Sequence, residues 1–283
     1  MSSTMMPRVS VSTWSLHRTL GQPEISGVER GMDIPQASHE KGASTLLELP
    51  ARLAAFGLHT LEICHFHLPR LEKSYLTELR SALEESDIEL FSLLIDNGDI
   101  TDAAHVVGEL AWMTNWIEIA GYLGAKHARV IAGKAEPSEE ALQMSVRGLR
   151  YLAAHAQASG IRLMTENWFA LFSQPKTVQT VLDQLEGCVG LCVDFGNWHG
   201  PTKYEDLSAI VDRAESCHAK AHFTASGVMD AKDFTRCIAL TRAAHFAGPY
   251  TLIYDGPDPD EWQGLAQERD VLVSAGLFPD VVD

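Results

Sequence analysis

Short apolar runs alternate regularly along this sequence with longer segments of helical spacing, and this pattern limits the folds that the chain can adopt. Apolar residues recur with a helical period at 46–56, 71–84, 104–123, 139–158, 178–185, 230–246 and 261–275. Eight runs rich in β-branched or apolar residues have strand character, at 9–14, 60–66, 88–95, 127–132, 161–167, 189–195, 216–222 and 250–255. Strands that alternate with helices form parallel sheets, and eight repeats favour closure into a barrel. The sequence predicts an α/β protein, a single (β/α)8 TIM barrel over residues 1–283.

A doubly wound open sheet is the alternative fold. No Gly-x-Gly-x-x-Gly segment follows the first predicted strand and no Walker loop occurs, which favours the barrel. Gly57 and Gly124 stand where helices would end, as expected for helix-to-strand turns. The one long irregular stretch, residues 21–42, follows the first strand on the side where such barrels bind ligands. It is predicted to be either a lid over the mouth or a surface insertion.

The composition predicts a globular domain with a substantial core, because 46% of residues are hydrophobic and 21% are charged. The formal net charge of −16 repels phosphate backbones and anionic lipid, which argues against a nucleic-acid or membrane partner. No apolar run is long enough to span a bilayer, and residues 1–8 lack the order of a signal peptide. We therefore expect a cytoplasmic protein, with homo-oligomer formation left open.

The five cysteines are odd in number and stand mostly in apolar segments, at positions 64, 188, 192, 217 and 237. This usage predicts buried, reduced thiols in a cytosolic protein. Cys188 and Cys192 have no second pair that would complete a zinc site.

Four predicted strands of the second half end on a residue able to bind a divalent cation: Glu166, Asp194, His218 and Asp255. In a parallel barrel the carboxyl ends of the strands meet at one mouth. A charged side chain that points into the barrel is costly unless it is paired, hydrogen-bonded or metal-bound. Each group alone could cap a strand or form a salt bridge. Together they predict a shared polar site for Mn²⁺, Mg²⁺, Co²⁺ or Zn²⁺.

Three segments carry a family resemblance: Thr-Glu-Asn-Trp at 165–168, Val-Asp-Phe-Gly-Asn-Trp at 193–198 and Cys-His-Ala-Lys at 217–220. The order and spacing of these segments are similar to those of the xylose-isomerase-like TIM-barrel superfamily of sugar phosphate isomerases and epimerases. The resemblance covers nearly the whole chain. That superfamily also includes inosose dehydratases and the endonuclease IV branch. The resemblance implies that Glu166, Asp194 and His218 are metal ligands and that Glu62 lies near the substrate.

The eighth strand departs from the family pattern. Ile253 stands where relatives have a metal-binding glutamate, and Asp255 follows two residues later. In a strand these two side chains share a face but lie about 6 to 7 Å apart along it. Asp255 is predicted to replace the missing ligand, and capping of the strand is the alternative. The seventh strand departs as well, with Ala221 where the family motif has an aspartate.

Further candidates lie near predicted strand ends. Trp14 and Trp168 would offer flat apolar walls to the C–H faces of a sugar, with core packing as the alternative. His199 is predicted to bind substrate, with a surface-loop position as the alternative. His222 is predicted to contact substrate or to orient His218. His65 and its neighbour His67 are assigned to packing or to the rim, rather than to contact with a sugar or a second metal.

The resemblance implies a divalent-metal-dependent sugar isomerase or epimerase that acts on a small carbohydrate or polyol. Glu166 would remove the proton next to a carbonyl, and Asp255 would return it. Lys220 would stabilise the charge of the developing enediolate. One alternative is a sugar or polyol lyase that resembles inosose dehydratases. The other is a non-catalytic sugar-binding barrel with a degraded metal site.

Overall fold

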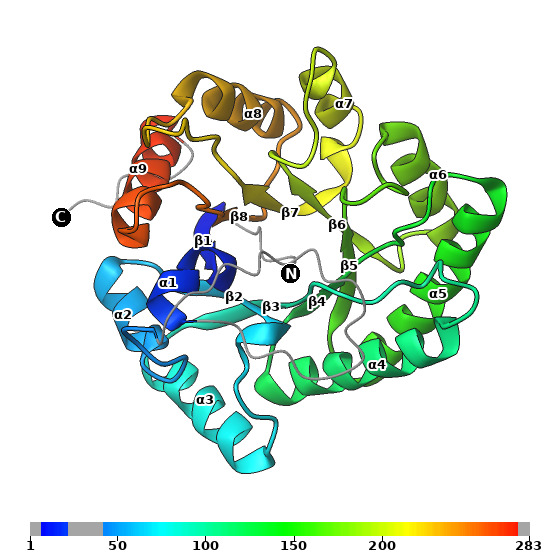
Figure 1. Cartoon of the computed structure of the whole chain (residues 1–283), viewed down its shortest axis with the longest axis horizontal. Helices are drawn as coiled ribbons and strands as arrows, with labels where there is room; N and C mark the ends of the chain where they lie inside the picture. Colours follow the sequence, from blue (N-terminus) through cyan, green and yellow to red (C-terminus); the bar gives the residue numbers. More distant parts are fainter. Residues whose placement is uncertain (1–6, 22–41, 277–283) are drawn as a thin grey trace, which may run out of the picture.

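Eight parallel strands close into a barrel in sequence order, with β1 paired to both β2 and β8 (Figure 1). The computed structural model describes residues 7–21 and 42–276. The strands are β1 (Arg8–Ser12), β2 (Thr60–Cys64), β3 (Glu89–Ile95), β4 (His127–Val130), β5 (Arg162–Glu166), β6 (Gly190–Asp194), β7 (Ala214–Ala219) and β8 (Pro249–Leu252). The predicted (β/α)8 barrel is confirmed.

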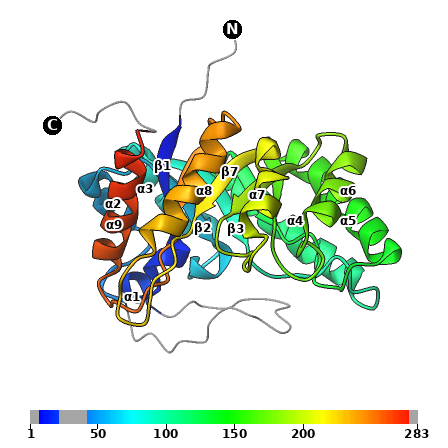
Figure 2. The same ribbon diagram turned by 90° about the horizontal axis from the view of Figure 1, so that it is seen from above.

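The helices form a ring around the strands, as the views along and across the barrel show (Figures 1 and 2). They are α1 (His17–Leu20), α2 (Leu49–Phe56), α3 (Lys73–Glu85), α4 (Val106–Leu123), α5 (Glu139–Ala158), α6 (Pro175–Leu185), α7 (Lys203–Ser208), α8 (Ala231–Ala243) and α9 (Glu261–Ser274). Single 3-10 turns are η1 (Thr13–Leu16), η2 (His65–His67) and η3 (Val211–Arg213).

All seven segments predicted from periodicity are helical, whereas α1 and α7 were not predicted. These two helices are four and six residues long, too short to display a helical period. Most of the predicted lid, residues 22–41, lies outside the described residues. Within the described part of the chain, no helix has the length and apolarity needed to cross a membrane.

Local sequence explains where the helices begin and end. Ser138 starts α5, because its side chain accepts a hydrogen bond from the Ala141 amide. Gly57 and Gly124 end α2 and α4 with φ angles of 84° and 82°, a left-handed conformation that glycine adopts without strain. The predicted helix-to-strand turns at these two glycines are confirmed.

Every strand except β3 ends earlier than predicted, and the largest differences are at β7 and β8. The seventh and eighth predicted runs extended to residues 222 and 255, whereas β7 ends at Ala219 and β8 at Leu252. The Lys220 amide donates a 3.0 Å hydrogen bond to the His218 carbonyl, and this tight turn takes the chain out of the ladder. The side-chain alternation of a strand therefore does not apply beyond Ala219. Lys220, His222 and Asp255 all lie in loops at the mouth.

Candidate active site

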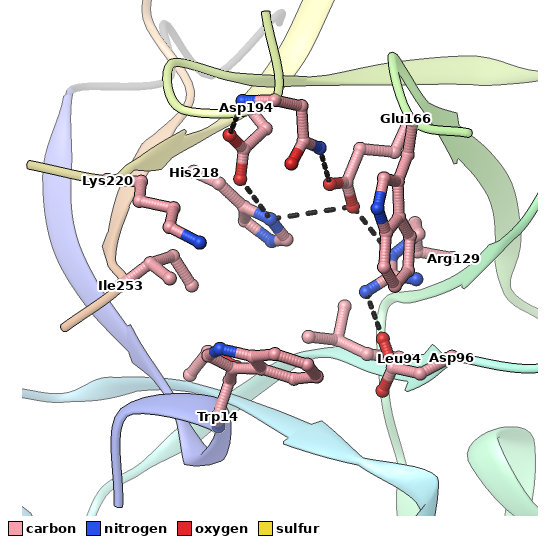
Figure 3. Close-up of a pocket in the computed structure, with 12 residues that line it drawn as sticks. Trp14, Leu94, Asp96, Arg129, Glu166, Asp194, His218, Lys220 and Ile253 are labelled. Atoms are coloured by element: carbon pink, nitrogen blue, oxygen red, sulfur yellow. Dashed lines mark hydrogen bonds and ion pairs between the residues drawn. The ribbon is translucent and has the colours of Figure 1, made fainter. Parts of the chain in front are cut away.

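A cavity of about 210 Å³ opens at the carboxyl ends of the strands (Figure 3). Three of the four predicted ligands line it: Glu166 at the end of β5, Asp194 at the end of β6 and His218 on β7. Each of these residues is only 4% exposed, so their charges interact in a medium that screens them weakly. The structure thus brings the three matched motif residues together at one site.

His218 is the centre of this group. Its Nε2 lies 2.9 Å from Oε2 of Glu62, a fully buried carboxylate on β2. Its Nδ1 lies 3.5 Å from Glu166 Oε2 and 3.6 Å from Asp194 Oδ2. Burial alone would lower the pKa of His218, but Cys192 and the surrounding carboxylates raise it well above its ordinary value. One ring nitrogen is therefore held by a carboxylate while the other faces two more.

Asp194 is oriented by the loop that follows it. Its Oδ1 accepts hydrogen bonds from the amides of Gly196 at 2.6 Å and Asn197 at 2.8 Å. The Asn167 side chain fixes the backbone, since it donates to the Asp194 carbonyl and accepts from the Asp194 amide. These contacts leave Oδ2 as the oxygen that faces His218.

Glu166 is held by two groups that the sequence had not singled out. Asn197 Nδ2 donates to its Oε1 at 2.7 Å, and Arg129 Nε lies 3.0 Å from its Oε2. Burial alone would raise the pKa of Glu166, but the Arg129 guanidinium and His218 lower it below its usual value. Glu166 therefore remains ionised at neutral pH.

Arg129, on β4, is a buried cation with two acidic partners. Its Nη2 donates to Asp96 Oδ1 at 2.5 Å, and its guanidinium lies 5.5 Å from the centre of the Trp168 ring. Burial alone would raise the pKa of Asp96, but Arg129 lowers it to about 2. The signal in the sequence was a basic residue inside an apolar strand-like run, which needs a buried counter-ion.

Lys220 and Asp255 lie at the edge of the cavity. Lys220 lines the cavity, and its Nζ lies 2.6 Å from Asp255 Oδ2. Burial alone would lower the pKa of Lys220, but Asp194 and Asp255 raise it, so the amine is charged at neutral pH. The Asp255 side chain is 44% exposed and lines a neighbouring pocket. Ile253, which replaces the family glutamate, is buried and lines the cavity itself.

The remaining predicted residues fall into three groups. Trp14 and Trp168 line the cavity and are half-buried, so each presents an apolar surface to it. His199 and His222 are exposed and line the neighbouring outer pocket with Asp255. His65 is fully buried with its ring edge-on to tryptophans of α4, a packing position.

The donor set fits a divalent metal ion. Metal-binding histidines commonly have one ring nitrogen fixed by a carboxylate while the other binds the metal. His218 has this arrangement, with Nε2 held by Glu62 and Nδ1 facing Glu166 and Asp194. Glu166 Oε2 is buried and forms an ion pair with Arg129 at 3.0 Å, but it accepts no well-directed hydrogen bond from the described residues. Among those residues, the ligand atoms that all lie within 4.8 Å of one another come from Glu166, Cys192 and His218. Neither Asp194 nor Asp255 is in that group, and their roles as ligands stay predictions.

Solved structures show the same fold over nearly the whole chain. A xylose isomerase-like TIM barrel protein from Mycobacterium smegmatis, in complex with magnesium, is 17% identical with a TM-score of 0.67, covering 97% of this chain and 99% of that one. A D-allulose 3-epimerase from Methylomonas sp. is 14% identical with a TM-score of 0.70, covering 97% and 100%. An L-ribulose 3-epimerase is 13% identical with a TM-score of 0.69, covering 95% and 94%.

Among curated proteins, a sequence search finds no match. A family model described as xylose isomerase-like TIM barrel matches residues 50–269, which include every strand except β1. The chain belongs to the xylose isomerase-like TIM barrel family.

Proposed function

We propose that this protein is a divalent-metal-dependent isomerase or epimerase of a small carbohydrate or polyol, which acts by proton abstraction next to a carbonyl. The observation that carries the proposal is the position of His218, with Nε2 held by Glu62 and Nδ1 facing Glu166 and Asp194. The epimerase names of the similar structures support a carbohydrate substrate.

Glu166, Asp194 and His218 would hold the metal. When bound, it would polarise a substrate carbonyl and acidify the neighbouring C–H bond. Glu166 is the proposed base, since its lowered pKa keeps it ionised and Asn197 fixes its other oxygen. Lys220 carries a fixed positive charge at the cavity wall and would stabilise the enediolate. Asp255 would hold Lys220 in place through their ion pair.

Trp14, Trp168 and Leu94 would pack against the apolar face of the substrate and exclude water from the reacting carbon. Arg129 would keep Glu166 oriented without leaving its ion pair with Asp96. The substrate therefore needs a polar face toward Glu166, Asp194 and His218 and an apolar face toward Trp14 and Leu94.

A lyase reaction is the second candidate, and Ile253 is the observation that favours it. An epimerase that inverts a carbon with two bases needs a second proton donor opposite Glu166, and the eighth strand offers an apolar side chain there. Lys220 could instead protonate a departing hydroxyl group. Proton removal by Glu166 followed by loss of water would then give a dehydrated product.

Deuterium exchange tests both candidates at once. Metal-loaded protein is incubated in D2O with a panel of ketoses, polyols and inososes, and the products are examined by NMR. We expect deuterium at the carbon next to the carbonyl for at least one substrate, and loss of that exchange in Glu166→Gln. Glu84→Gln, at an exposed ion pair on α3, is the control and should behave as wild type.

The outcomes separate the proposals. Deuterium incorporation with the hydroxyl groups retained supports the isomerase or epimerase, whereas incorporation with loss of water supports the lyase. Sugar binding without any exchange, under every metal tested, would contradict both and leave a non-catalytic sugar-binding barrel.

A further inference from the structure

We infer that Cys192 is a fourth protein ligand of the metal, so that the site selects zinc or another thiophilic divalent cation over magnesium. This inference rests on the proposed metal site. Cys192 would supply, from the interior of the barrel, the ligand that Ile253 fails to provide at the mouth.

The strand register places Cys192 beside Glu166. Across β5 and β6 the paired residues are Glu166 and Cys192, and across β6 and β7 they are Asp194 and His218. Cys192 and Asp194 are two residues apart on one strand, so both side chains point into the barrel. Cys192 lies at the level of Glu166, and Asp194 lies about 6 to 7 Å nearer the mouth. A cation between Glu166 and His218 would have Asp194 on one side and Cys192 on the other.

The distances fit a shared ion. One ligand atom from each of Glu166, Cys192 and His218 lies within 4.8 Å of the other two, and all three residues are buried. Bonds of roughly 2.0 to 2.3 Å to one zinc ion would place such atoms roughly 3 to 4 Å apart. Small side-chain rotations therefore suffice for these three residues. Asp194 lies outside the group, with Oδ2 3.6 Å from His218 Nδ1, and its side chain would have to move toward the ion. The Glu166 oxygen that faces His218 is also buried, and Arg129 Nε lies 3.0 Å from it without a well-directed hydrogen bond among the described residues.

The ligand chemistry sets the choice of metal. Thiolate is a soft ligand that favours zinc and cobalt, whereas magnesium is bound by oxygen atoms in octahedral geometry. Two carboxylates, an imidazole and a thiolate form a donor set typical of zinc, which can accept a substrate oxygen as a fifth ligand. With Cys192 the site is suited to zinc. Without Cys192 the remaining two carboxylates and imidazole also suit manganese or magnesium.

The chain offers a matched control for Cys192. Cys217 on β7 is also buried and free, and it pairs with Val193, so it belongs to the opposite face of the sheet. Cys217 packs in the apolar core between the barrel and its helices. Serine at either position removes a buried thiol of the same size, but only the change at Cys192 removes a proposed ligand.

The test is the absorption spectrum of the cobalt-loaded protein. Metal-free protein is titrated with Co²⁺, and a thiolate ligand gives a sulfur-to-cobalt charge-transfer band in the near ultraviolet. We expect this band in the wild type and in Cys217→Ser, and its loss in Cys192→Ser. Zn²⁺ affinity, measured by competition with a chromophoric chelator, should fall at least about tenfold in Cys192→Ser. Mg²⁺ affinity should be unchanged.

Wild-type protein that binds one Co²⁺ without the band would overturn the inference and leave the three-ligand site of the proposed function intact. A band that persists in Cys192→Ser would overturn it as well. Absence of any divalent metal binding in the wild type would contradict the inference and the proposed function together. Should Cys192→Ser fail to fold, the comparison of wild type with Cys217→Ser, together with Cys192→Ala, still decides the question.

Discussion

At the scale of single residues, the site depends on charges that are buried in pairs. Glu62 fixes one side of His218, and Arg129 lies between Glu166 and Asp96. A buried ion pair contributes little net stability, because desolvation offsets much of the attraction. Removal of one partner is costly, since it leaves the other charge buried and unpaired. These pairs therefore orient the side chains that face the cavity.

Glu62→Gln tests the contact that orients His218. The amide keeps the size of the side chain but removes the charge that fixes the imidazole. Loss of such a carboxylate behind a metal-binding histidine typically lowers metal affinity by about 10- to 100-fold. We expect a decrease of this size for Zn²⁺ by isothermal titration calorimetry, with Glu84→Gln at the wild-type value. Wild-type affinity in Glu62→Gln would show that Glu62 does not support the metal site.

Arg129→Met tests the buried cation. The change leaves Asp96 and Glu166 without their positive partner, so the free energy of unfolding should fall by about 3 to 5 kcal/mol. The pKa of Glu166 should rise, because burial raises it and Arg129 no longer opposes that effect. Urea denaturation gives the stability. The double variant Arg129→Met/Asp96→Asn should recover part of the loss, and equal stability of the two variants would contradict the pairing.

At the scale of elements, the order of strands and helices was predictable because each kind of element has its own period in the sequence. The alternation of apolar runs with helical segments predicted the barrel, which the structure shows. Because parallel strands end at one mouth, it also predicted that Glu166, Asp194 and His218 would line one cavity, as they do. The two-residue alternation of side chains no longer predicts their direction where the backbone leaves the sheet, at the turn from His218 to Lys220. The Arg129 pairs join side chains from separate strands. Such pairs depend on register and rotamer, which no local pattern encodes.

Gly196→Ala tests the loop after β6. A Cβ atom at this position would lie 2.7 Å from Lys220 Cδ, so the flexible lysine side chain must move while the backbone stays in place. We expect lower turnover in the deuterium-exchange assay with metal affinity within about twofold of wild type. Gly108→Ala on α4 is the control, since its Cβ meets no atom within 4 Å. Unchanged turnover in Gly196→Ala would argue against a role for Lys220.

At the scale of the whole molecule, the buried acids make stability depend on pH. The folded-state pKa of Asp96 is about 2, below its unfolded value of 3.8. Asp96 therefore stabilises the fold above pH 3.8, and this contribution is lost as pH falls through about 2. The shift corresponds to about 2 kcal/mol. Urea denaturation from pH 5 to 2 should show a steeper loss for wild type than for Asp96→Asn, and parallel curves would contradict the assignment.

Glu166, Asp194 and His218 are proposed to form one metal site at the mouth of the barrel. The most direct test is calorimetric titration of metal-free protein with Zn²⁺ and Mn²⁺, on wild type, Asp194→Asn and His199→Ala. Asp194 faces His218, whereas His199 lies in the outer pocket. We expect one ion per chain in wild type and His199→Ala, and at least about tenfold weaker binding in Asp194→Asn. Equal binding in all three proteins, or no binding in wild type, would contradict it.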